Sequence, residues 1–433
     1  MTSKFFEKNN TVNDLRNRLL FVFFILIIYR LGAHIPIPLV DAKQILNSFS
    51  DDNAGIFSLF NLFSGGALSK ITVFSLGIMP YISSSIIIQL LSTTWEPMIK
   101  LKKDGDFGRR KMSDYTRLLT VVLSSFQAVA MAKMIINFSI YSNFNFLFYS
   151  VIVITLVAGT LFLMWLGELI NEKGIGNGIS LIIFTSIVSN LPRSVASTLE
   201  KVRQGELNII VMFLFLIVLF VVIFLIIFVE RAQKKITINY PKRQQGRKVF
   251  AAQTTFLPLK INMSGVIPPI FASSLILFPI TLIHWLDPNS SNFILNSIRY
   301  IITPGKLPYL FLFALFIIFF CFFYTSLVFK SSDTADNLKR SGGFIAGIRP
   351  GDNTAAYIDK IVKKLTIIGA FYLTFVCLLP EFLVTFLNVP FYFGGTSLLI
   401  VIVVIMDFIS QVQSKMISYK YDGLIKKYKL TGF

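Results

Sequence analysis

The residues that could perform acid, base or nucleophilic chemistry are few in this sequence. It has two histidines, His34 and His284, no H-E-x-x-H motif for zinc and no G-x-x-x-x-G-K-[ST] loop for a nucleotide. The carboxylates Glu168, Asp407 and Glu381 lie toward the ends of apolar runs, not in their middle. Ion-coupled transporters usually carry an acid or base at mid-membrane, which disfavours a driven solute pump. We expect no enzymatic activity, no metal and no cofactor.

The composition places the chain among polytopic membrane proteins. Of its 433 residues, 54% are hydrophobic and only 15% are charged, and the mean hydropathy is +0.70. The two cysteines, Cys321 and Cys377, both lie inside apolar runs, where neither a disulfide framework nor a zinc site is expected. They are interpreted as packing residues.

Ten apolar runs are candidates to span a membrane, which predicts an all-α fold. A spanning helix needs about 20 apolar residues to cover a bilayer core of roughly 30 Å. The runs are 19–33, 71–91, 118–136, 146–166, 175–191, 209–229, 266–286, 307–328, 365–386 and 391–409.

The distribution of positive charge predicts the orientation of these spans. Most of the 41 Lys and Arg residues lie in one alternate set of loops, which places that set and both termini in the cytoplasm. Spans one to five and six to ten then form two inverted five-helix halves. We predict an N-terminal half at 1–189, an external hinge at 190–208 and a C-terminal half at 209–433, with cytoplasmic loops at 230–262 and 330–364.

A short apolar stretch precedes the second span. Residues 56–68 (IFSLFNLFSGGAL) cannot cross a bilayer, and run 71–91 carries Pro80, three consecutive serines and Gln89. The second span of the other half begins with Pro268 and Pro269. Interrupted helices at membrane depth occur where they line a cavity, and matching interruptions in inverted halves indicate a central site. We interpret 56–68 as a half-helix plug in a pore.

Two basic loops have features of ordered structure. The net charge is +19, and 236–240 alternates like a strand before the basic stretch 242–246 (KRQQG), which predicts a hairpin with that stretch as its tip. Residues 337–351 place Arg340 and Arg349 among glycines and a proline. Such loops suit docking to an acidic protein or to RNA. The alternative is a solvated basic face attracted to anionic lipids.

Several motifs together resemble the bacterial SecY family of preprotein translocase channel subunits, and the similarity covers nearly the whole chain. The motifs are RLLF at 18–21, FSGGAL at 63–68, GIMPYI at 77–82, GIGNGIS at 174–180, the stretch 240–247, GIRPG at 347–351 and FYFGGTS at 391–397. The resemblance implies an hourglass-shaped, protein-conducting channel that binds signal sequences and also opens sideways between spans two and seven. It implies SecE and SecG as partner subunits, and the SecA motor or a ribosome on the cytoplasmic side.

The resemblance also implies roles for individual residues. Positions 78 and 82 lie on one helix face, and a ring of branched aliphatic side chains offers ions no ligands. An isoleucine in an apolar span can otherwise face lipid or fill a core. The implied pore ring is Ile78, Ile82, Ile183, Ile270 and Ile400, and the implied plug residues are Phe57, Phe60, Phe63, Ser64, Gly65 and Gly66.

Polar positions complete the implied site. Gln89, Gln127 and Asn262 match the lateral gate, although buried amides also hydrogen-bond for packing alone. The residues implied in motor or ribosome docking are Lys242, Arg243, Arg247, Arg340 and Arg349. Ala346 departs from the family's usual proline before GIRPG, which bears on the details of motor docking.

Two other classes of protein were weighed. An inverted-repeat solute transporter would need a midplane site with coupling residues, and an intramembrane hydrolase would need a buried nucleophile paired with a base; the spans supply neither. The sequence therefore predicts a multi-pass conduit for unfolded polypeptides in a bacterial cytoplasmic membrane, with a thylakoid as the alternative location.

Overall fold

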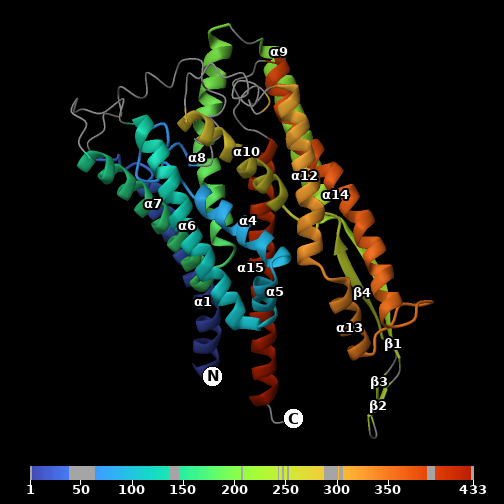
Figure 1. Ribbon diagram of the computed structural model, residues 1–433. Coiled ribbons are helices and arrows are strands. Elements are labelled where there is room, and N and C mark those ends of the chain that lie inside the picture. Colours follow the sequence, from blue (N-terminus) through green and yellow to red (C-terminus); the bar gives the residue numbers. More distant parts are fainter. Residues whose placement is uncertain are drawn as a thin grey trace.

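The computed structural model describes residues 2–38, 64–135, 146–205, 208–241, 243–245, 248–250, 253–286, 301, 306–387 and 395–430. These residues form a bundle of long helices, with both ends of the described chain on the same side of the molecule (Figure 1). The helices are α1 (Thr2–Gly32), α4 (Met79–Thr94), α5 (Glu96–Lys103), α6 (Gly105–Ile135), α7 (Phe146–Lys173), α8 (Gly178–Arg203), α9 (Ile209–Arg231), α10 (Ile267–Leu286), α12 (Leu307–Val328), α13 (Ser331–Ser341), α14 (Asp352–Leu387) and α15 (Gly395–Leu430).

The described helices account for the predicted apolar runs. Within the described residues, seven helices are long and apolar enough to cross a membrane: α6, α7, α8, α9, α12, α14 and α15. The three other predicted runs overlap α1, α4 and α10. The outward face of α9 exposes large apolar side chains, among them Phe213, Ile217, Phe220 and Phe224, as a lipid-facing helix requires. The chain is therefore a multi-pass membrane protein, and the number of ten crossings stays a prediction.

The three prolines singled out in the second spans, Pro80, Pro268 and Pro269, lie where helices begin, whereas Pro279 lies inside α10. Pro80 occupies the first turn of α4, and Pro268 and Pro269 follow directly on Ile267, the first residue of α10. Proline fits the first helical turn because its missing N–H would have no partner there. Run 71–91 is accordingly not one helix: residues 64–78 form turns, and helix begins only at Met79.

The stretch predicted as a hinge is largely helical. Helix α8 continues to Arg203 with Pro192 inside it, and Asn208 caps α9. The division of the chain into two halves stays a prediction.

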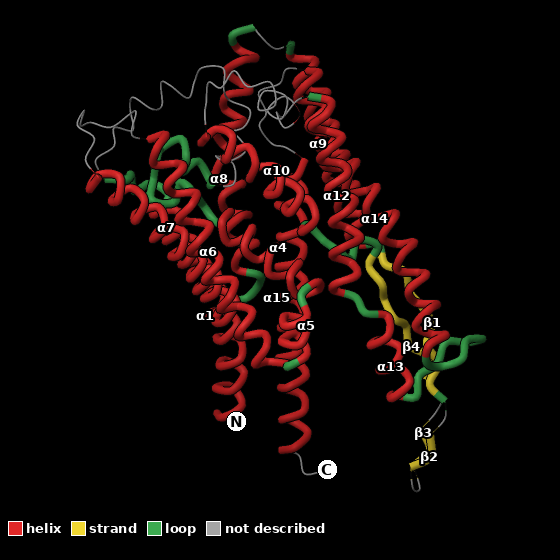
Figure 2. The backbone as a smooth tube through the Cα atoms, viewed as in Figure 1, coloured by secondary structure: helices red, strands yellow, loops and turns green. Residues whose placement is uncertain are grey.

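The first basic loop forms the predicted hairpin at the end of the bundle where the termini lie (Figure 2). Strand β1 (Gln233–Tyr240) pairs antiparallel with β4 (Gln253–Lys260). Beyond them, β2 (Arg243–Gln245) pairs with β3 (Lys248–Phe250). Most of the basic stretch that we expected to be the tip is therefore strand, and Gln245 pairs with Lys248.

The second basic loop packs against this hairpin. Helix α13 ends at Gly342, whose left-handed backbone (φ 72°) reverses the chain. Phe344 and Asn239 of β1 then exchange two backbone hydrogen bonds, of 2.9 and 3.0 Å. Beneath them, Ile236, Ile345 and residues of α14 share a small hydrophobic core. The two basic loops thus form one unit with the start of α14.

The main hydrophobic core joins both predicted halves. In Figure 1, α1, α6 and α7 lie on one side, α9, α12 and α14 on the other, and α4, α10 and α15 between them. Contacts between the halves are made by α10 with α4 and α6, and by α15 with α1 and α8. The buried side chains of this core come from α1, α4, α7, α8, α9, α10, α12, α14 and α15, and from the segments after α1, before α4 and before α10.

Candidate functional site

The five isoleucines of the predicted ring are all buried in the main core. Ile78 and Ile82 come from the start of α4, and their exposed fractions are 2% and 5%. Ile183 of α8, Ile270 of α10 and Ile400 of α15 are exposed by 2%, 7% and 0%. All five belong to one hydrophobic cluster, with two helices contributed by each predicted half. That they form a pore ring stays a prediction.

The end of the predicted plug is tied to helices α1 and α8. Tyr29 of α1 hydrogen-bonds to Ser186 of α8 and donates to the carbonyl of Ser64 at 3.4 Å. The carbonyl of Gly65 accepts from Arg30 at 3.1 Å and from Ser189 at 3.3 Å. Three side chains thus hold two carbonyls in place, and Ser186 holds the hydroxyl of Tyr29. Phe57, Phe60 and Phe63 lie outside the described residues.

Glycine is required at position 65 on two grounds. Its φ of +70° lies in the left-handed region, which side chains disfavour. A Cβ there would also lie 2.9 Å from the hydroxyl oxygen of Tyr29 and 3.1 Å from Cα of Ser186. Gly66 is left-handed as well, with a φ of +81°. The SGG motif therefore permits a close approach of this backbone to α1 and α8.

The predicted gate glutamines lie on helices next to α10. Gln89 of α4 donates to Ser85 at 3.1 Å, and its buried Oε1 has no hydrogen-bond partner within the described part of the chain. Gln127 is half-buried on α6. Helices α4, α6 and α10 contact one another, so both amides lie on the helices that would border a lateral gate.

Asn262 differs from the two glutamines, because its hydrogen bonds lie within the C-terminal half. Its amide nitrogen donates to Glu230 of α9 at 2.6 Å and to the carbonyl of Gly265 at 3.1 Å. Its Oδ1 accepts from Ser264 and from the backbone N–H of Gly265. These partners organise the loop before α10 and do not belong to α4 or α6.

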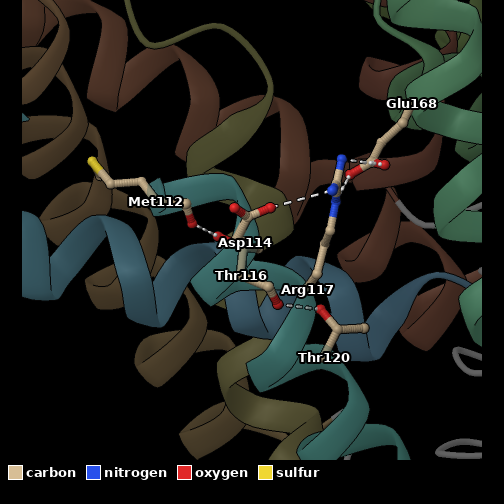
Figure 3. Close-up of polar contacts among 6 residues, drawn as sticks. All are labelled: Met112, Asp114, Thr116, Arg117, Thr120 and Glu168. Atoms are coloured by element: carbon tan, nitrogen blue, oxygen red, sulfur yellow. Dashed lines mark hydrogen bonds and ion pairs between the residues drawn. The ribbon is translucent and has the colours of Figure 1, made fainter. Parts of the chain in front are cut away.

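A bidentate ion pair that we did not predict joins α6 to α7 (Figure 3). Nε and Nη2 of Arg117 each lie 2.9 Å from one carboxylate oxygen of Glu168, and Nη1 lies 3.3 Å from Asp114. A fork of two parallel bonds is the strongest geometry for this pair. Glu168 drew attention in the sequence only as a carboxylate near a span end, and its spacing from Arg117 carries no signal.

The docking residues that the structure describes lie at the end of the bundle with the hairpin. Arg340 lies in the last turn of α13, Arg349 lies between Gly347 and Gly351, and both are exposed. Thr354 donates to the carbonyl of Arg349 at 2.9 Å, which ties this loop to α14. Arg243 begins β2, whereas Lys242 and Arg247 lie outside the described residues.

Positive charges from the two halves meet near this end. Desolvation by burial lowers the pKa of Lys102 on α5, and the positive charge of Lys330, just before α13, lowers it further.

In the described residues, no group of three or more His, Cys, Asp or Glu side chains could hold a metal ion.

Comparison with known proteins gives consistent results. The family model SecY matches residues 72–409. Protein translocase subunit SecY of Escherichia coli (strain K12) is 53% identical over 426 residues, covering 98% of this chain and 96% of the relative. Protein translocase subunit SecY of Vibrio cholerae serotype O1 is 51% identical over 429 residues, with the same coverage of each chain.

Solved structures show the same fold. One described as "The structure of a protein conducting channel" has a TM-score of 0.68 at 18% identity and covers 93% of each chain. Sec61 in the canine ribosome-channel complex has a TM-score of 0.65 at 17% identity, again with 93% of each chain covered. The fold is that of a protein-conducting membrane channel. The chain belongs to the SecY family.

Proposed function

We propose that this chain is the central channel of a Sec translocase, a passive and gated conduit for unfolded, signal-bearing polypeptides. One observation carries the proposal: five isoleucines from four helices, two in each half, are buried in one cluster. Aliphatic side chains give ions no ligands, so a narrow ring of them dewets when it is empty. The same ring can yield around a passing chain of any sequence.

The plug adds a second barrier. The ties of Ser64 and Gly65 to α1 and α8 fix its C-terminal end in the N-terminal half. A plug fixed at this end can leave the pore and return to the same position.

A lateral gate lies between α4 and α6 on one side and α10 on the other. These helices carry the contacts between the halves along this face. Separation of the halves there opens a route from the conduit to the lipid, by which apolar segments of a substrate leave sideways. Amides at Gln89 and Gln127 suit such a gate, because an interhelical amide bond contributes only about 0.6–2 kcal/mol. In the described residues Gln89 bonds to Ser85 of its own helix, which leaves its Oε1 available to a partner across the gate.

The exposed arginines support a docking face toward the cytoplasm. The hairpin and α13, which carries Arg340 in its last turn, lie at the end of the bundle where both termini lie. The positive-inside rule assigns that end to the cytoplasm. We assign SecA or a translating ribosome to this face, SecE and SecG as further subunits, and anionic lipids of a bacterial inner membrane as the surroundings. Two related structures are ribosome-bound channels.

The proposal is tested by photo-crosslinking to a stalled secretory chain. A photoreactive residue replaces Ile82 in the cluster or, as a matched control, Phe220, which is 68% exposed on α9. We expect an adduct with the stalled chain from position 82 and none from position 220. Equal adducts at the two positions, or none at 82 while export proceeds, would contradict a conduit through this cluster.

A further inference from the structure

A buried polar cluster lies where α10 begins. Glu230, in the last turn of α9, is 9% exposed, and Asn262 and Ser264, in the loop before α10, are 3% and 2% exposed. Ser264 also contacts the sulfur of Cys321 on α12 at 3.3 Å. Buried polar groups in a membrane protein are costly unless they are paired, so a cluster of this kind has to be satisfied internally.

Asn262 is the centre of this cluster, because both ends of its amide are used. Oδ1 accepts from Ser264 at 3.0 Å and from the N–H of Gly265 at 3.1 Å. An N–H donor requires the oxygen on that side, so the NH₂ group is directed toward Glu230 and the carbonyl of Gly265. The bond to the Glu230 carboxyl group is short for an N–H···O bond, at 2.6 Å.

The backbone around Asn262 is also held by the C-terminal half. The N–H of Ile261 donates to the carbonyl of Ala232 at 3.2 Å, which continues the connection to α9. On the other side, α14 approaches so closely that a Cβ at Gly369 would lie 3.1 Å from the carbonyl oxygen of Ile261. Helices α9, α12 and α14 thus surround the loop from which α10 starts.

We propose that Glu230 and Asn262 are positioning residues that fix the start of α10 to the C-terminal half. With this anchor in place, α10 separates from α4 and α6 only when that half moves as a body. The role of α10 at a gate rests on the proposed function, but the anchor itself does not. If the anchor is lost, α10 shifts on its own and the gate loses its defined closed position.

Three variants test the anchor. In N262D a second carboxyl group faces Glu230 at hydrogen-bond distance, so the two either repel as charges or one must take up a proton. The NH₂ donor to the carbonyl of Gly265 is lost as well. E230Q keeps an acceptor for the NH₂ group of Asn262. In the double variant E230Q/N262D the new glutamine donates to the new aspartate, so one negative charge and one hydrogen bond are kept.

The native cysteines provide the readout. Alkylation of Cys321 by N-ethylmaleimide in membrane vesicles, measured by mass spectrometry, reports opening of the cluster that Cys321 contacts. Cys377 on α14, as buried as Cys321 at 1% exposure, is the internal reference for general loosening of the fold. We expect N262D to raise labelling of Cys321 about tenfold relative to Cys377, E230Q to change it less than about twofold, and the double variant to restore most of the protection.

The controls distinguish failure of the anchor from failure of the proposed gate. N353D makes the same chemical change at an exposed asparagine and should leave both cysteines protected. Any of three results would overturn the anchor. Labelling of Cys321 could be equal in N262D and the native chain, it could increase equally at both cysteines, or the double variant could be labelled as much as N262D. Cross-linking of α4 to α10 in the otherwise native chain tests the gate separately, because alkylation of Cys321 does not depend on it.

Discussion

At the scale of single residues, Gly65 determines how closely the plug segment approaches its neighbours. An alanine side chain at this position would contact Tyr29 and Ser186. The alanine would also have to adopt a left-handed backbone conformation, which costs roughly 1–2 kcal/mol. We expect G65A to displace residues 64–66 and to raise ion leak through the resting channel, measured as bilayer conductance. Gly205, with a φ of +80° and nothing within 4 Å, is the matched control. Equal leak from G65A and G205A would show that backbone strain alone is responsible.

A second prediction at this scale concerns the buried isoleucines. We expect I78N to hydrate the cluster and loosen its seal, because the amide binds water where an aliphatic side chain does not. Export of a substrate with a weakened signal sequence should rise several-fold, measured as the processed fraction in cells. I317N, on α12 in the same cluster but outside the predicted ring, is the control. A similar rise from I317N would indicate general loosening of the core.

At the scale of elements, the fork between Arg117 and Glu168 joins α6 to α7. We expect R117L to destabilise the protein by about 0.5–1 kcal/mol, because the two side chains are 45% and 19% exposed and solvent screens part of the attraction. The thermal unfolding midpoint of the purified protein measures this loss. The pair of Arg109 and Asp106 is 3.9 Å apart and 83% and 94% exposed, so R109L should have no measurable effect. An equal decrease from both substitutions would contradict a specific role for the fork.

The proposed gate is tested at the contact between α4 and α10. We expect a disulfide between cysteines introduced on α4 and α10 to block transport, because the two halves can then no longer separate there. Export before and after reduction of the disulfide is the measurement. A disulfide between α6 and α7, which lie in the same half and also contact each other, should leave export unchanged. Export through the linked α4 and α10 pair would exclude a gate at this position.

At the scale of the whole molecule, the opposite ends of the bundle have different expected roles. R349E reverses a charge on the loop beside the hairpin, and we expect it to abolish motor-driven export while the channel still assembles, because repulsion replaces attraction to an acidic partner. Export assays in vesicles and recovery of the assembled complex measure the two effects. R203E, at the far end of α8, reverses a charge at the opposite end of the bundle and should leave export intact (Figure 1). Full export by R349E would contradict the docking role.

The predictions made from the sequence were most accurate where the signal is local. Apolar runs, the basic hairpin and a proline near each second span all follow from a few consecutive residues, and helices or strands lie at each of them. The sequence predicted that prolines interrupt the second spans, whereas Pro80, Pro268 and Pro269 lie where helices begin. Proline can kink a helix or begin one, and only the conformation of the chain before Met79 and Ile267 shows which of these it does.

By itself, the sequence determined the class of protein, the membrane character of the chain and the family, since apolarity over about 20 residues and long motifs are properties of consecutive positions. Only the tertiary structure decided that Asn262 bonds to Glu230 instead of a residue across the predicted gate, and that Arg117 pairs with Glu168. It also decided that five separate isoleucines share one cluster. Each of these partnerships joins distant parts of the chain, and it exists only because helix packing brings the side chains within a few ångströms of one another.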